Sequence, residues 1–375
     1  MTTVTSERAA ASTAPAPRRR VSGRLAFLIP AGLCLLVGLD AALVLLGVPA
    51  PVRADRLPDV HGMLLVFGFV GTLVSLERAV ALGRRAGYLA PGLFGAGGVL
   101  LVSPAPLAVG QTLLVLGAAA LVGVYVPLWQ RQQDDAVLVQ AFGAVLGTGA
   151  LLMWRGGVPV PHLLPWLAGF VVLTIAGERL ELARIAMGRS AGTRLLLLSV
   201  GVVGGVVASL LWPVPGHALL GLALLAFVGW LARHDVARVT IRTTGLTRFM
   251  AASMLAGYVW LAVAGATWTL AGTAYDGPAY DVVVHAVFLG FTISMIMAHA
   301  PVILPAVVRR PLPYHPAMLV PAGLLQLSLV VRLWCGDAYH VDTAVKVGGV
   351  LNVVALLGFV AVAGWSATRG PERAR

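Results

Sequence analysis

The stretch "HGMLLVFGFVGTLVSLER" at residues 61–78 decides the fold, because it is an apolar run of membrane length with polar residues at both ends. Its Gly-Phe pair places Phe69 eight residues after His61 and eight before Glu77. A helix needs about 20 apolar residues to cross the hydrocarbon core of a bilayer. The stretch therefore predicts a transmembrane helix that holds its polar residues for a structural or chemical reason.

The same spacing returns twice along the chain. "HLLPWLAGFVVLTIAGER" sets its Gly-Phe phenylalanine eight residues after His162 and eight before Glu178. Residues 280–305, "YDVVVHAVFLGFTISMIMAHAPVILP", set it six after His285 and eight before His299. These runs are the second, sixth and tenth apolar segments, so the period is four helices. We expect three four-helix units that close into a ring.

Composition places the whole chain in a membrane. Of its 375 residues, 59% are hydrophobic and 11% charged, and the mean hydropathy of +0.90 excludes an ordinary soluble domain. The apolar runs have the length of helices and lack the alternation of barrel strands. The two cysteines, Cys34 and Cys335, form no CxxC or CxxCH motif, which excludes a disulfide framework and covalent c-type haem attachment. We predict an all-α membrane protein.

The sequence divides into twelve apolar segments with no soluble domain between them. They cover about 25–48, 60–82, 88–103, 106–129, 136–154, 162–183, 194–212, 216–232, 247–272, 280–307, 315–335 and 343–366. We predict twelve transmembrane helices in three pseudo-repeated four-helix arcs. Residues 23–368 make one transmembrane domain, between a disordered tail at 1–22 and a short tail at 369–375.

The net charge of +12 indicates the orientation of the chain in the membrane, because the arginines lie in short loops and form no single basic domain for nucleic acid. The arginine-rich set of alternate loops includes residues 18–20, 84–85, 184–194, 233–248, 309–310 and 369–375. The other set holds mainly Arg53, Arg56 and Arg155. The positive-inside rule then places both termini in the cytoplasm. We expect a multi-pass protein of the plasma (inner) membrane, with the lipid bilayer as its first partner.

The motifs carry a resemblance to a known family. "HGMLLVFGF" and "HAVFLGFTISMIMAHAPVILPAVVRRP" resemble the NnrS family, membrane proteins with haem and copper that are distantly related to the catalytic subunit of haem-copper oxidases and nitric oxide reductases. The resemblance covers nearly all the chain in topology and two helices in motif. The seventh segment lacks the adjacent histidine pair that holds copper in those oxidases, so copper remains an option only.

The resemblance implies a haem site in the outer part of the bilayer. His61 and His285 would be the axial ligands of one b-type haem, since neutral imidazole is a normal haem ligand. The ordinary alternative for each is a hydrogen bond between helices. Met63 could offer a thioether sulfur, although packing is its simpler role. His162 could be a second metal ligand or a solvated relic of the repeat. The ligand implied is nitric oxide or another small diatomic gas, with an electron donor as a further partner.

A second polar group is expected near the cytoplasmic ends of the central helices. Glu77, Arg78, Glu178, Arg179 and His299 could meet there and share or relay protons. Alternatively, the Glu-Arg pairs mark helix ends and reach into the interface. Sixteen residues rotate a regular α-helix by roughly 160°, so the histidine site and this cluster should be separate.

Two other functions stay open. Twelve helices with cytoplasmic termini and an inner cluster of acids fit a proton-coupled secondary transporter. A cofactor-free homologue that serves as a scaffold is the third option. Haem colour in the purified protein would distinguish the first function from both.

Overall fold

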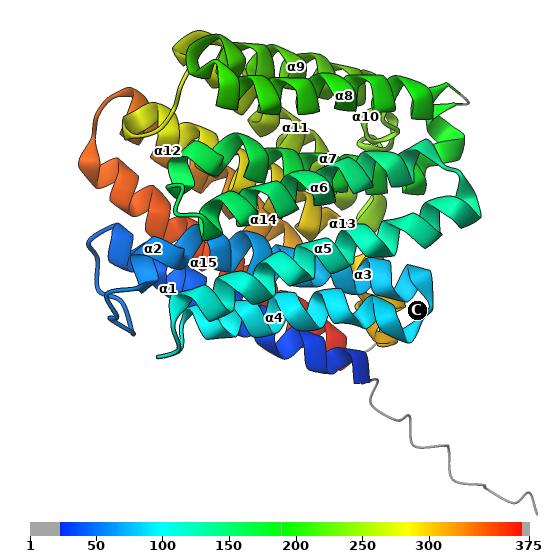
Figure 1. Cartoon of the computed structure of the whole chain (residues 1–375), viewed down its shortest axis with the longest axis horizontal. Helices are drawn as coiled ribbons and strands as arrows, with labels where there is room; N and C mark the ends of the chain where they lie inside the picture. Colours follow the sequence, from blue (N-terminus) through cyan, green and yellow to red (C-terminus); the bar gives the residue numbers. More distant parts are fainter. Residues whose placement is uncertain (1–22, 189, 370–375) are drawn as a thin grey trace, which may run out of the picture.

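The computed structural model describes residues 23–188 and 190–369, and within them it contains helices and loops but no strand (Figure 1). The predicted tails fall outside this part of the chain, except that Arg369 ends the last helix. The helices that are α-helical throughout are α1 (Leu28–Leu45), α4 (Leu89–Leu101), α5 (Leu107–Gln132), α6 (Asp135–Arg155), α7 (Val160–Met187), α8 (Ala191–Leu211), α9 (Pro213–His234), α10 (Ala237–Thr240), α11 (Gly245–Ala271) and α15 (Asp342–Arg369).

The remaining helices are composite. They run continuously through α2 (Leu57–Met63), η2 (Leu64–Gly71) and α3 (Thr72–Leu82), through α12 (Gly277–His285), η4 (Ala286–Ile293) and α13 (Ser294–Val308), and through η5 (Pro316–Met318), α14 (Leu319–Leu329) and η6 (Val330–Ala338). Short 3₁₀ turns, η1 (Gly23–Phe27) and η3 (Arg85–Tyr88), precede α1 and α4.

Eleven of the helices in the described part of the chain are long and apolar enough to cross a membrane. The predicted fold class, an all-α membrane protein, is therefore confirmed. The third predicted segment, 88–103, corresponds to α4, which has only 13 residues and is shorter than the other spans. It contains Pro91 and four glycines, and its small side chains pack closely against α5 and η2.

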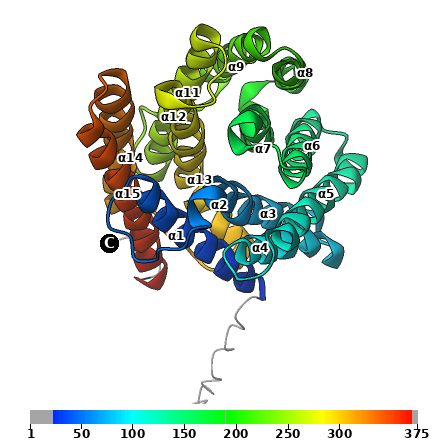
Figure 2. The same ribbon diagram turned by 60° about the vertical axis from the view of Figure 1, so that its left-hand side comes forward.

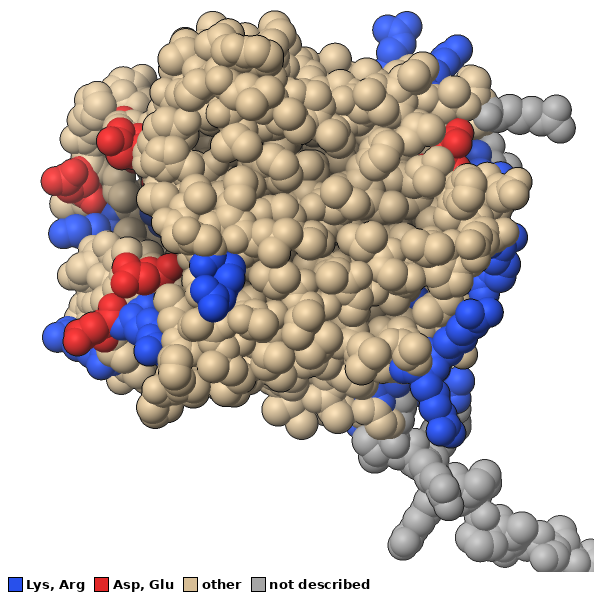
Figure 3. All heavy atoms as spheres, viewed as in Figure 1, with Lys and Arg blue, Asp and Glu red and all other residues tan. Residues whose placement is uncertain are grey.

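Charged side chains gather at the two ends of the molecule and leave a broad uncharged band between them (Figure 3). One end shows almost only arginine, and the other shows acidic and basic side chains together. Both ends of the described chain lie at the arginine-rich end (Figure 1). An uncharged surface of this kind is what a helical bundle presents to lipid.

The three segments that share the Gly-Phe pattern form the centre of the bundle. The most apolar windows of the composite helix 57–82, of α7 and of the composite helix 277–308 are 67%, 78% and 67% buried, against 39–56% for the other eight spans. Figure 2 shows these helices inside the ring, with α8, α9, α14 and α15 at the periphery. The shared pattern thus marks the helices that other helices surround.

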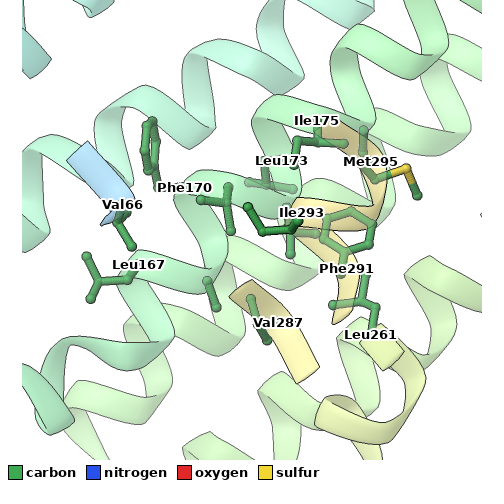
Figure 4. Close-up of a cluster of buried hydrophobic side chains, with 14 of the residues drawn as sticks. Val66, Leu167, Phe170, Leu173, Ile175, Leu261, Val287, Phe291, Ile293 and Met295 are labelled. Carbon is green, nitrogen blue, oxygen red and sulfur yellow. The ribbon is translucent and has the colours of Figure 1, made fainter. Parts of the chain in front are cut away.

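Aromatic and branched side chains fill the space between these central helices. Phe67 stacks on Phe170 with 5.1 Å between ring centroids, which joins η2 to α7. In Figure 4, Phe170 of α7 lies near Val66 of η2, and Phe291 of η4 lies beside Leu261 of α11. Packing of this kind substitutes for the hydrophobic effect, which does not drive helices together within lipid.

Two of the central helices contain π-helical turns that begin just after their histidines. These are η2, three residues after His61, and η4, directly after His285. The Thr292 hydroxyl donates to the Val287 carbonyl five residues earlier, as expected for a widened turn. By contrast α7 stays α-helical through its Gly-Phe pair. The rotation calculated for a regular helix therefore does not apply between His61 and Glu77, since η2 lies between them.

Candidate functional site

An outer cavity of about 640 Å³ lies between the central helices and α1, η6 and α15, at the end opposite the arginine-rich one. His61 from α2 and His285 from α12 both line it. Most of the wall is apolar, with Leu39, Leu65, Leu167 and Phe288 among its residues. Its polar groups come mainly from Asp59, Gln111, Tyr280, Arg332 and Asn352. The structure thus brings together two histidines that lie 224 positions apart in the chain.

The imidazole of His61 is fixed by the first helix. Its Nδ1 lies 2.8 Å from the carbonyl oxygen of Gly38 in α1. A carbonyl only accepts, so Nδ1 carries the proton and Nε2 keeps its lone pair. Gly38 has no side chain, and a Cβ there would meet Leu65 of η2 at 2.6 Å. The glycine therefore allows α1 to approach closely enough to orient the ring.

The imidazole of His285 has two anchors of its own. Its Nδ1 lies 2.9 Å from the Asp281 carbonyl oxygen and 3.2 Å from the Asp281 carboxylate oxygen Oδ1. Arg332 of η6 donates two hydrogen bonds to the same carboxylate, Nε to Oδ2 and Nη2 to Oδ1, both at 2.7 Å. A carboxylate behind a histidine fixes the ring and makes its free nitrogen a stronger ligand.

The other proposed outer ligands lie away from this cavity. Met63 is fully buried in the core and does not line it. His162 is exposed and stacks on Tyr275, with 4.2 Å between ring centroids. Burial raises the pKa of Tyr275. Tyr275 also meets His217 edge-on, so His162 belongs to an aromatic cluster at the end of the bundle opposite the arginine-rich one.

A second, inner cavity of about 100 Å³ opens between the central helices at their other end. Glu77 from α3, Glu178 from α7 and His299 from α13 line it. Their neighbours in the wall are apolar and include Leu28, Val70 and Met295. These three side chains therefore line one cavity, and this cavity is separate from the histidine pair.

The inner group contains residues that sequence reasoning missed. Arg78 donates to Glu181 at 2.7 Å and also forms an ion pair with Glu77. Gln140 of α6 donates its side-chain amide to Glu181 at 3.3 Å. Glu181 lies three residues after Glu178 on α7, a spacing that puts both on one helix face. That spacing was the signal for Glu181, whereas nothing in the sequence pointed to Gln140.

Arg179 faces away from the Glu178 group and forms a different buried pair. Its Nε and Nη2 donate to Asp235, each at 2.7 Å. Tyr258 of α11 donates to the same carboxylate at 2.7 Å, and the Ala237 amide donates at 2.8 Å. Burial opposes ionisation of Asp235, but the hydrogen bonds and charge of Arg179 outweigh it and lower the pKa of Asp235. This pair joins α7 to the loop after α9.

Residues 23–188 and 190–369 contain no group of three or more histidine, cysteine, aspartate or glutamate side chains placed to hold a metal ion. No curated protein matches the chain. Residues 24–368 match the family described as Domain of unknown function (DUF8744), and the chain belongs to that family.

Proposed function

We propose that this protein is a haem-binding membrane protein in which His61 and His285 hold the iron of one b-type haem in the outer cavity. The observation that carries the proposal is the pair of imidazoles from two central helices that line one mainly apolar cavity. Neutral imidazole is a normal ligand of haem iron, so the proposal is made for haem.

The side chains present fit this cofactor. Each imidazole donates a hydrogen bond from its Nδ1–H to a backbone carbonyl oxygen. The acceptor is Gly38 for His61 and Asp281 for His285. Both Nε2 atoms are therefore left as acceptors, the form that a metal requires. A cavity of about 640 Å³ also falls within the range of cofactor sites.

The chemistry that haem would supply is reversible binding of a small diatomic gas at iron. The resemblance to the NnrS family makes nitric oxide the first candidate, with a role in its binding, response or detoxification. The protein's own residues would orient the two imidazoles and keep the cavity apolar. Asp281, itself held by Arg332, would keep His285 in place, and the Gly38 carbonyl would orient His61.

The proposed topology has twelve crossings with both termini in the cytoplasm. Both ends of the described chain lie at the same end of the bundle (Figure 1), which requires an even number of crossings. Eleven helices are long enough by themselves, so η3 and α4 together would make the twelfth. The excess of arginine at this end supports its cytoplasmic placement, in a plasma (inner) membrane. The ring would then consist of three four-helix repeats.

The test is the optical difference spectrum, dithionite-reduced minus oxidised, of detergent-purified protein from cells supplied with haem. Wild type should show a b-type spectrum, and His61→Ala and His285→Ala should each lose or shift it. His162→Ala is the matched control, since this outer histidine does not line the cavity, and it should keep the spectrum. A colourless wild type would refute the proposal and favour the transporter or scaffold function.

A further inference from the structure

At and next to the inner cavity, acidic side chains outnumber basic ones. Glu77 and Glu178 lie in the cavity wall, and the guanidinium of Arg78 pairs with Glu77 and with a third acid beside the cavity, Glu181. Arg78 contacts Glu77 and Glu181, and its side chain is 7% exposed. The nearest other cation, Arg179, is engaged with Asp235. Glu178 is therefore the carboxyl group of this set that forms no ion pair with another described residue.

Glu178 shares the inner cavity with a second acid, Glu77. Glu77 and Glu178 both line the inner cavity, and most of their neighbours in its wall are apolar. Two carboxylates cannot form a hydrogen bond unless one of them carries a proton. Two acids in the wall of one mainly apolar cavity favour holding one proton between them, because full ionisation would place like charges side by side.

His299 supplies an independent observation in the same cavity. The residue is 6% exposed, and its Nδ1 lies 2.8 Å from the Met295 carbonyl oxygen, which turns Nε2 away from its own helix. His299 Nε2 is buried and has no hydrogen-bond partner among the described residues. An orphaned buried acceptor costs free energy, and this residue lines the cavity that also contains the two acids.

We propose that the inner cavity is a proton-binding site in which Glu77 and Glu178 share one proton and His299 Nε2 is the acceptor that takes it when the acid ionises. The proton leaves a carboxyl oxygen and arrives on the imidazole nitrogen, so the total charge of the site stays the same. Glu181, whose side chain is 30% exposed, connects the site to water at the arginine-rich end. This proposal does not depend on haem.

Several other groups set the electrostatics of this site. On the acid side these are Arg78, Glu181 and Tyr125 of α5, and on the histidine side they are Arg179 and Asp235. Arg24 of η1 donates to the carbonyl of Val307, which lines the cavity. The ion pairs of Arg78 and Arg179 are formed with carboxylates other than that of Glu178.

The experiment is infrared spectroscopy of the full-length purified protein at neutral pH, in H₂O and in D₂O. A protonated carboxyl group gives a C=O stretching band that shifts in D₂O and that a carboxylate lacks. The wild type minus Glu178→Gln difference spectrum should contain this band. The difference isolates the inner site from other buried acids, such as Asp337 in the outer part of the protein. Glu77→Gln should also lose the band, since Arg78 is then free to pair with Glu178.

Glu181→Gln is the matched control on the same helix and should keep the band. His299→Phe tests the acceptor: without it the proton must leave the buried site, so the band should persist to higher pH than in wild type. The proposal is overturned if the difference spectrum lacks the band, or if Glu181→Gln removes it and Glu178→Gln does not. An unchanged titration in a folded His299→Phe would overturn the role of His299. Each outcome can be read whether or not the protein binds haem.

Discussion

Replacing Asp235 by Asn tests whether a buried ion pair fastens the central helix α7 to the loop after α9. The Asp235 side chain is 0% exposed, and it accepts two hydrogen bonds from Arg179 and one each from Tyr258 and Ala237. Asparagine keeps the shape but removes the charge and turns one acceptor into a donor. That donor would face groups that are themselves donors, and Arg179 would be left as an uncompensated buried cation.

The expected loss follows from these contacts. Two charge-assisted hydrogen bonds of about 1.5–3 kcal/mol each are lost or weakened. Breaking a buried pair by removing one partner costs about 3–5 kcal/mol in comparable sites. We therefore expect Asp235→Asn to lower the free energy of unfolding by about 3–5 kcal/mol.

The assay is reversible unfolding in mixed detergent micelles with increasing SDS, followed by circular dichroism. Arg184→Met is the matched control, because Arg184 forms a pair with Asp134 at a similar distance, 2.8 Å, but its side chain is 69% exposed. Loss of such an exposed pair should cost about 0–1 kcal/mol. This variant also leaves Asp134 free to cap α6 through the Ala136 amide.

A double variant, Arg179→Met with Asp235→Leu, distinguishes the cost of an unpaired buried charge from the cost of altered packing. Replacing both charges by apolar side chains of similar volume is often neutral, so it should be more stable than Asp235→Asn alone. The reasoning fails if Asp235→Asn costs no more than the Arg184→Met control. It also fails if the double variant is less stable than the single one.

Three further predictions concern pH, packing and topology. The pKa of Asp235 in the folded protein lies below its ordinary value near 3.8. Its contribution to stability is therefore complete above that pH and is lost as the pH falls further. In an acid-unfolding series, the stability of Asp235→Asn should depend less on pH than that of wild type. Gly98→Val should cost about 1–3 kcal/mol in the SDS assay, since a Cβ there would lie 3.0 Å from the Gly68 Cα. In intact cells, a membrane-impermeant maleimide should modify Asp276→Cys but not Thr243→Cys.

Controls for the last two predictions come from the same chain. Gly123 of α5 has open space where a Cβ would be added, so Gly123→Ala should not destabilise the protein. The labelling needs a background with Cys34→Ser and Cys335→Ser. Modification of Thr243→Cys from outside the cell would reverse the proposed orientation, and an unchanged Gly98→Val would contradict the close approach of α4 to η2.

Local features of the helices could be predicted from the sequence because each depends on residues near one another in the chain. Apolar runs gave the position of eleven membrane-length helices, since lipid requires every backbone group to be satisfied within its own helix. The Gly-Phe pattern singled out the three most buried helices, as central helices need small and aromatic residues for close packing. The short α4 and the π-helical turns of η2 and η4 were not predicted, because they depend on tertiary packing.

The sites divide in the same way. Sequence spacing placed His61 and His285 in the outer half of the bundle and Glu77, Glu178 and His299 in the inner half, because depth in a membrane follows from position along a helix. It assigned Arg179 to the same group as Arg78, since the two occupy equivalent positions after a glutamate. In the structure Arg179 contacts Asp235, which follows α9 and is 56 residues away.

What the sequence by itself determined is therefore the class of protein, the helices and the depth of each polar residue. Only the tertiary structure decided which side chains meet. His61 and His285 line one cavity, and Asp281 and Arg332 anchor His285. His299, whose Nε2 has no hydrogen-bond partner among the described residues, lines a cavity with two acids. The reason is physical: hydropathy fixes where a helix lies along the membrane normal, whereas the rotation and neighbours of that helix are fixed by packing against helices distant in the chain.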